Sequence, residues 1–200
     1  MNYHIEIINC DSSRLYENTS IFEALRYSGC RDFTDEALCK TAKECLFELC
    51  QRITPKAICV KLPVKTEGAF VDFGFCRYES RSLVTFLKGA SRVGVFAATV
   101  GVGADMLISR YSPIFPSKAV ITDGAAGAAI ECFCDIICRE YFKTKEQERF
   151  SPGYGDLPLA MQRDIISFLD ASLKIGLTLT DSMLLTPTKS VTAIVPLRDN

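Results

Sequence analysis

A run of small residues inside a long helical pattern constrains the fold of this chain more than any other feature. Residues 117 to about 145 follow a helical pattern, and residues 124–129 within it are all glycine or alanine. Small side chains lower helix propensity, but they let a neighbouring backbone or a ligand approach the helix closely. Glu131 follows this run. We therefore expect a long helix that a neighbouring backbone or a ligand can approach closely, with one carboxylate directly after the small residues.

The rest of the chain alternates between helical and strand patterns, which predicts an α+β fold in a single domain over residues 1–200. Helices are expected at 20–27, 35–54, 80–88, from 103 onward, and at 158–169, and strands at 3–8, 57–64, 69–75, 92–100, 173–179 and 189–197. Ser20 and Glu23 form a capping-box pattern, in which serine accepts from the backbone and glutamate reaches back. Residues 65–68 predict a turn that joins two strands into a hairpin. Pro196 lacks a backbone donor, so we expect the last strand to lie at a sheet edge or to end there.

The apolar fraction and the charge balance exclude several classes of function. Hydrophobic residues make up 48% of the 200 residues, which is enough for one sizeable core. Lysine and arginine total 23 against 24 aspartates and glutamates, so we expect no nucleic-acid partner. We find neither a leader sequence nor an apolar stretch of roughly 20 residues, the length that spans a bilayer. The expectation is a cytoplasmic protein without a membrane partner.

Ten cysteines and one histidine limit the metal chemistry that the chain can support. The closest cysteines, Cys132, Cys134 and Cys138, lie in the long helical pattern with a spacing that matches neither zinc ribbons nor the usual iron–sulfur runs. We interpret them as reduced, core-filling thiols and predict no metal site. Because His4 is the only histidine, a histidine-built metal centre is nearly excluded, and we assign no catalytic residue.

Residues 149–156 predict a shaped loop, because Pro152 removes a donor while Gly153 permits left-handed dihedral angles. Taken alone, this loop is also typical of a tight turn that follows a surface arginine. The pattern Arg149-x-x-Pro152-Gly153-Tyr154 resembles the R-x-x-P-G-Y segment of the activation domain of cobalamin-dependent methionine synthase. In that family, the segment is the central part of the S-adenosylmethionine (SAM) site.

Further sequence blocks extend the resemblance over nearly the whole chain, in the same order as in the family. These blocks are residues 23–27, 96–101, 123–131, 155–159 and 185–192. Several ordered blocks are more specific than one short motif. The chain looks most similar to the small, separately encoded versions of the domain. The resemblance implies a C-shaped α+β fold, with helices around a twisted, mostly antiparallel sheet.

The resemblance also implies a SAM site built from Arg149, Ser151, Pro152, Gly153, Tyr154 and Glu131. Arg149 can hold the ligand carboxylate through its planar guanidinium, and Glu131 is the candidate for the ligand ammonium. Gly153 lets the backbone approach a ligand, so the amide and carbonyl groups from Pro152 to Tyr154 can bind adenine or ribose. For Glu131, the alternative is an ordinary solvated or paired helix carboxylate.

The family's function implies an accessory role for this chain. It would present SAM during reductive reactivation of cobalamin, while a flavodoxin-like donor supplies an electron. The sequence contains no D-x-H-x-x-G cobalamin-ligand motif, so cobalamin would be held mainly by a methionine synthase chain that lacks its own activation domain. Two alternatives remain open: a SAM-binding module that serves another corrinoid protein, and an independent SAM-dependent methyltransferase acting on a small molecule.

Overall fold

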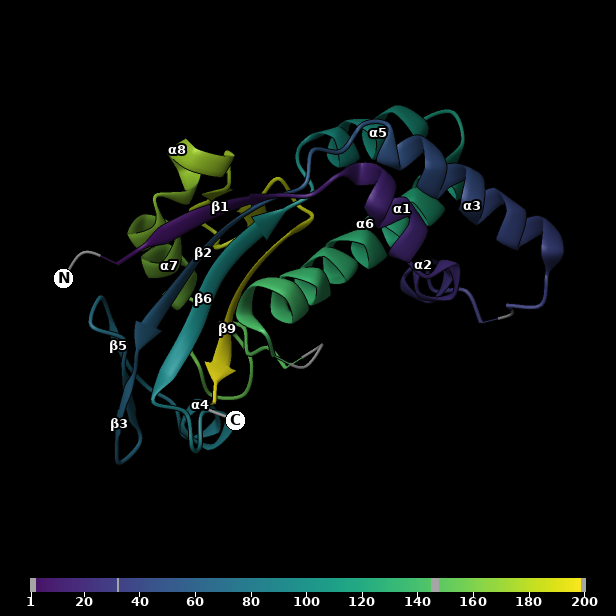
Figure 1. Ribbon diagram of the computed structural model, residues 1–200. Coiled ribbons are helices and arrows are strands. Elements are labelled where there is room, and N and C mark those ends of the chain that lie inside the picture. The colour runs from purple at the N-terminus through teal and green to yellow at the C-terminus, as the bar shows by residue number, and fades with distance from the viewer. Residues whose placement is uncertain (1–2, 32, 145–147, 199–200) are drawn as a thin grey trace.

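Four antiparallel strands form the main sheet of the protein. The computed structural model describes residues 3–31, 33–144 and 148–198. The strands follow the order β1-β2-β6-β9 (Figure 1), and they are β1 (Ile5–Asn9), β2 (Lys56–Pro63), β6 (Arg92–Thr99) and β9 (Ser190–Leu197). Each neighbouring pair is antiparallel. The expected mostly antiparallel sheet is therefore confirmed.

One face of this sheet is covered by helices. They are α1 (Ser12–Asn18), α2 (Ile21–Tyr27), α3 (Glu36–Cys50), α5 (Gly103–Tyr111) and α6 (Pro116–Ile136), which continues as the π-helical segment η1 (Ile137–Phe142). Cys59 and Phe96 of the sheet share a hydrophobic core with Phe133 of α6. Because α2, α3 and α5 all pack against α6, this helix is the centre of the layer (Figure 1).

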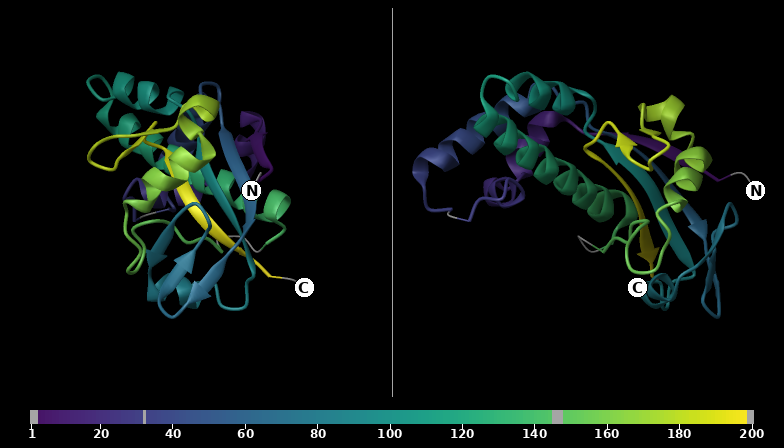
Figure 2. Two further views of the ribbon diagram at one scale, coloured as in Figure 1. Left: turned by 90° about the vertical axis from the view of Figure 1, so that its left-hand side faces the viewer. Right: turned by 180° about the vertical axis from the view of Figure 1, so that it is seen from behind.

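The opposite face of the sheet carries a second hydrophobic core. It is covered by α4 (Arg81–Phe86), α7 (Met161–Leu169), α8 (Ala171–Ile175) and a small sheet of β3 (Lys65–Glu67), β4 (Phe70–Asp72) and β5 (Arg77–Glu79). A further strand pair joins β7 (Thr178–Leu179) to β8 (Leu185–Thr186). Val95 and Ile194 of the main sheet pack there with Ile165 of α7. In the right-hand view of Figure 2, helices α2 and α3 (purple and blue) and the small sheet occupy opposite ends of an arched molecule.

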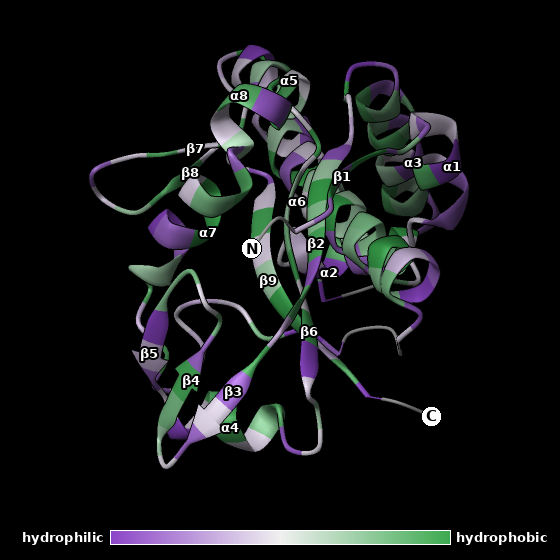
Figure 3. Cartoon of the chain, turned by 60° about the vertical axis from the view of Figure 1, so that its left-hand side comes forward, coloured by the Kyte–Doolittle hydropathy of each residue, from purple (hydrophilic) through white to green (hydrophobic). Residues whose placement is uncertain are grey.

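Covering both faces of the sheet explains the long apolar run of β6. Every residue of β6 after Arg92 is buried, as expected for a strand enclosed on both sides. By contrast, every residue of β3 is exposed, and Figure 3 shows hydrophobic colour along much of β2 and β9 but little on β3. Pro196 lies opposite Val93 in β9, the last strand in the sheet order. The edge position predicted from this proline is confirmed.

One expected strand pairing, and part of one expected strand, are wrong. Strand β2 pairs with β1 and β6 rather than with residues 69–75, and the expected turn at 65–68 is itself mostly strand β3, which pairs with β4. Residues 173–175 lie in helix α8 rather than in a strand. Ala171 and Ile175 are buried, whereas Leu173 between them is 85% exposed. Buried residues four positions apart favour a helix, although the composition of this segment is typical of a strand.

The helix boundaries agree with their sequence signals in most places. Ser20 accepts a hydrogen bond from the backbone N–H of Glu23, and Ser80 caps α4 in the same way. The Glu23 side chain, however, binds Arg26 instead of reaching back to the cap. The long helix ends at Phe142, and its expected end near residue 145 lies outside the described residues. Within residues 3–31, 33–144 and 148–198, no helix has the length and apolar character needed to cross a membrane.

Candidate functional site

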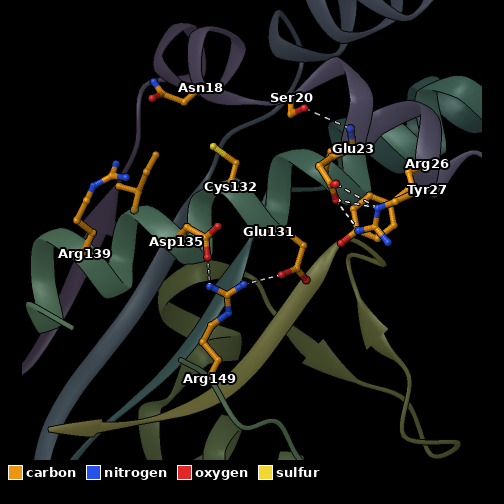
Figure 4. A pocket seen from close by; sticks show the side chains of 12 residues that line it. Asn18, Ser20, Glu23, Arg26, Tyr27, Glu131, Cys132, Asp135, Arg139 and Arg149 are labelled. Carbon is orange, nitrogen blue, oxygen red and sulfur yellow. Dashed lines mark hydrogen bonds and ion pairs between the residues drawn. The ribbon is translucent and has the colours of Figure 1, made fainter. Parts of the chain in front are cut away.

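A polar cavity of about 390 Å³ lies between α2 and α6. Its wall combines residues from α1, α2, α6, η1 and the segment after η1 (Figure 4): Asn18, Ser20, Glu23, Arg26, Tyr27, Ala128, Glu131, Cys132, Asp135, Ile136, Arg139 and Arg149. Its size falls within the range of small-molecule sites, roughly 300–1,000 Å³. Charges of both signs line it, which suits a ligand that carries both signs itself.

Arg149 bridges two carboxylates of α6 at the centre of this wall. Its Nη2 lies 2.6 Å from Oε2 of Glu131, and its Nη1 donates to Oδ1 of Asp135. The two carboxylates are four residues apart, so they lie on the same face of the helix. The Arg149 side chain is only 10% exposed, against 43% for Glu131. The alternative of a surface cation at position 149 is therefore excluded.

The backbone explains how Arg149 reaches α6. Phe150 donates to the carbonyl of Ile194 at 2.9 Å and accepts from its N–H at 2.9 Å, so this residue pairs with the outer edge of β9. The Phe150 ring packs against Phe86, 5.2 Å between centroids. Because the neighbouring residue is fixed to the sheet edge, the Arg149 guanidinium is held against the helix that covers the same edge.

Electrostatics keeps Arg149 charged in this setting. Burial, the largest effect, lowers the pKa of Arg149, but its interactions with Cys134, Asp135 and Glu131 together raise the pKa above the ordinary value. Across the whole cavity wall, three carboxylates (Glu23, Glu131 and Asp135) balance three arginines (Arg26, Arg139 and Arg149). Because Glu131 is the more exposed partner of Arg149, its carboxylate is the one that can also face an ammonium group.

The second wall of the cavity comes from α2. The Glu23 carboxylate accepts from Nε of Arg26 at 3.1 and 3.2 Å, and the Arg26 guanidinium carbon lies 4.5 Å from the Tyr27 ring centre. Desolvation, followed by the nearby Glu131 charge, raises the pKa of Tyr27. A glycine at 124 lets α2 lie this close, because a Cβ there would be 2.4 Å from the carbonyl oxygen of Ala24.

The loop residues Ser151, Pro152, Gly153 and Tyr154 are not among the residues that line the described cavity. The N–H of Gly153 donates to the carbonyl of Leu157 at 2.9 Å, and the N–H of Tyr154 donates to the carbonyl of Ser151 at 3.0 Å. These bonds confirm a turn, with Gly153 at φ +91°. Ligand recognition by this conformation of the loop would therefore use carbonyl oxygens or the Tyr154 side chain, which is exposed.

Asp156 anchors the end of this loop to the start of α4. Its carboxylate accepts from Oγ of Ser80 at 2.5 Å and from the N–H groups of Arg81 and Ser82 at 2.8 and 3.1 Å. These hydrogen bonds, that from Ser80 first, lower the pKa of Asp156 to about 2. The carboxylate is thus charged at neutral pH, and it fixes the loop from the side opposite to Arg149.

Of the six residues expected to bind the ligand, the structure brings Glu131 and Arg149 together and leaves the other four outside the cavity wall. Sequence reasoning missed Asp135, although it lies one helical turn after Glu131 on the same face. It also missed the functional potential of Arg26 and Tyr27, which belong to one of the blocks that carry the resemblance.

The three closely spaced cysteines of the long helix divide between the core and the cavity. Cys134 and Cys138 are fully buried in the core beside the sheet, as expected, and burial raises the pKa of both thiols. Cys132 lies on the cavity wall, and burial raises its pKa as well. Among the described residues, no group of three or more histidine, cysteine or acidic side chains is arranged to hold a metal ion.

The antiparallel sheet and its helical layers define an α+β domain. This domain has a charged pocket between α2 and α6. No protein-family model matches the chain, and no curated protein matches its sequence significantly. Thirteen chains of solved structures do match its structure. One is the MetH reactivation domain bound to AdoHcy, with a TM-score of 0.73 at 16% sequence identity, covering 98% of this chain and 79% of that chain. The chain therefore has the fold of the MetH reactivation domain, which confirms the expected fold class.

Proposed function

We propose that this chain binds SAM and acts as an accessory subunit in the reductive reactivation of a methionine synthase that lacks its own activation domain. One observation carries the proposal: Arg149 and Glu131, from two separate segments, meet at 2.6 Å in the wall of a 390 Å³ cavity. The structural neighbour with this fold is described with bound AdoHcy, the demethylated form of SAM, which supports a ligand of that class.

The charges of the cavity match the amino-acid end of SAM. A guanidinium offers five N–H donors, so Arg149 can bind a ligand carboxylate while it keeps its bond to Asp135. Glu131 is the more exposed partner of Arg149, so we propose that it turns toward the ligand ammonium. Asp135 then acts as the positioning residue that holds the guanidinium. In this proposal the loop from Ser151 to Tyr154, which lies outside the cavity wall, reaches the ligand only through its backbone carbonyls and the exposed Tyr154 ring.

Cobalamin would be held by the partner chain. The single histidine of this protein, His4, has an 84% exposed side chain next to Glu6 and does not line the cavity. When bound to the partner, cobalamin would accept the methyl group of SAM after one-electron reduction by a flavodoxin-like donor, and S-adenosylhomocysteine would remain. The residues of this chain would bind SAM, orient its sulfonium toward the partner and exclude water.

A reconstituted reactivation assay tests the accessory role. The cognate cobalamin protein is oxidised to its inactive form and incubated with SAM and a reduced flavodoxin-like donor, and methylation of its cobalamin is followed spectroscopically. We expect methylation to depend on this chain, and to fall at least about tenfold with Arg149→Lys, because lysine cannot bind a carboxylate through two N–H groups.

Two results would contradict the accessory role. Equal methylation with and without the chain would show that it has no part in the reaction. Methyl transfer to a small molecule by the isolated chain, without any cobalamin protein, would support the independent methyltransferase instead. The Arg110→Lys variant is the control, because Arg110 lies on α5 and not on the cavity wall.

A further inference from the structure

The α2 side of the cavity has no role in the proposal so far, although it carries two charged side chains. Glu23, Arg26 and Tyr27 line the cavity together with Glu131 and Arg149. Figure 4 shows the Glu23 carboxylate and Tyr27 on the α2 side, with Glu131 between them and Arg149. A ligand whose amino-acid end lies at Arg149 therefore extends past Glu131 toward α2 if it occupies the length of the cavity.

Local contacts hold the Glu23 carboxylate in one orientation. The Nε of Arg26 donates to both carboxylate oxygens, at 3.2 and 3.1 Å, and its Nη2 lies 2.5 Å from Oε2. Ser20 caps the helix through the N–H of Glu23 at 3.3 Å. An ionised carboxylate has about four lone-pair positions, so a carboxylate bound by one guanidinium edge can still accept two hydrogen bonds from a ligand.

The contact of Tyr27 with α6 shows how far the α2 side of the cavity lies from Arg149. The Tyr27 ring is packed between Arg26 and the backbone of α6, where a Cβ at Gly127 would lie 3.7 Å from the ring. Gly127 lies one helical turn before Glu131 and two turns before Asp135. The contact of Tyr27 with α6 is therefore separated from the two carboxylates that bind Arg149 by roughly 6–12 Å along the helix. The extended chain from the carboxyl group of SAM to its ribose is roughly 9 Å long at ordinary bond lengths.

We propose that Glu23 is a ligand-binding residue that accepts hydrogen bonds from the two ribose hydroxyls of an adenosyl ligand. This inference rests on the proposed SAM-binding function and deepens it, because it assigns the nucleoside end of the ligand to α2. A carboxylate that binds a ribose diol is an established solution in nucleotide recognition. Arg26 and Tyr27 are positioning residues in this scheme, since they orient Glu23.

Titrations with whole and partial ligands test the role of Glu23. S-adenosylhomocysteine carries both ends, whereas 5′-methylthioadenosine lacks the amino-acid end. We expect Glu23→Gln to lower the affinity for both ligands about tenfold, because charge-assisted hydrogen bonding to the ribose is lost in each case. With the 2′-deoxy form of methylthioadenosine, we expect Glu23→Gln to lower the affinity only about threefold, because one of the two hydrogen bonds is already absent and half of the free-energy effect remains. Calorimetry or NMR line shifts provide the affinities.

Two further variants separate the outcomes. Glu44→Gln makes the same change in an exposed carboxylate of α3 that does not line the cavity, and it should leave every affinity unchanged. Arg149→Lys should lower the affinity for S-adenosylhomocysteine but not the affinity for methylthioadenosine. If Arg149→Lys behaves so while Glu23→Gln changes neither ligand, the ribose assignment is wrong and the proposed function stands. If neither variant changes any affinity, both are wrong.

Discussion

Gly124→Ala should lower the free energy of unfolding by about 2–3 kcal/mol, although alanine is the better helix former. A Cβ at this position would lie 2.4 Å from the carbonyl oxygen of Ala24 and 2.7 Å from the backbone N of Ser28. Both atoms belong to the backbone of α2 and its C-cap, so they cannot move without displacing the helix. The clash would therefore disturb the packing of α2 on α6, which forms the second wall of the cavity.

Gly127→Ala provides the matched control on the same helix. Its added Cβ would meet Tyr27 at 3.7 Å or more, which is ordinary van der Waals contact. The gain in helix propensity should then raise the free energy of unfolding by up to about 1 kcal/mol. Urea unfolding of the two variants beside the parent measures both values. Equal effects of the two substitutions would show that α2 does not pack on α6 as described.

Arg149→Lys should lower the affinity for S-adenosylhomocysteine at least about tenfold while it keeps the positive charge. Lysine is a point charge, so it cannot bind Asp135 and a ligand carboxylate in the same planar geometry. Alanine would be a poorer test, because it would leave the partly buried Asp135 carboxylate without its guanidinium partner and would destabilise the fold as well as the site.

Isothermal titration of the two proteins measures this effect, and their thermal unfolding midpoints show whether the fold is retained. Arg110→Lys on α5 is the control for the exchange of arginine for lysine away from the cavity. An Arg149→Lys protein that folds normally and binds S-adenosylhomocysteine as tightly as the parent would remove Arg149 from the site.

The parts of the fold that follow from local physics were predictable from the sequence. The apolar run of β6 requires a strand covered on both faces, Pro196 requires an edge, and Ser20 caps a helix at its expected place. The small residues of α6 predicted a close approach, and the structure identifies the neighbour as α2 at Gly124.

The incorrect and missing predictions concern features that depend on tertiary contacts. The composition of residues 65–67 does not distinguish a turn from an exposed strand. These residues form a strand because they pair with β4. In the site, Glu131 and Arg149 were predicted through a family resemblance. Asp135 and Glu23 were not, because their importance depends on which helices face each other across the cavity.

The most direct test of a SAM site in this cavity is a crystal structure of the protein grown with S-adenosylhomocysteine. We predict ligand density between α2 and α6, with its carboxylate within hydrogen-bond distance of Arg149, its ammonium beside Glu131 and its ribose toward Glu23. Arg149 still paired with Glu131 and Asp135, with no ligand density between the two helices at saturating concentration, would contradict the account.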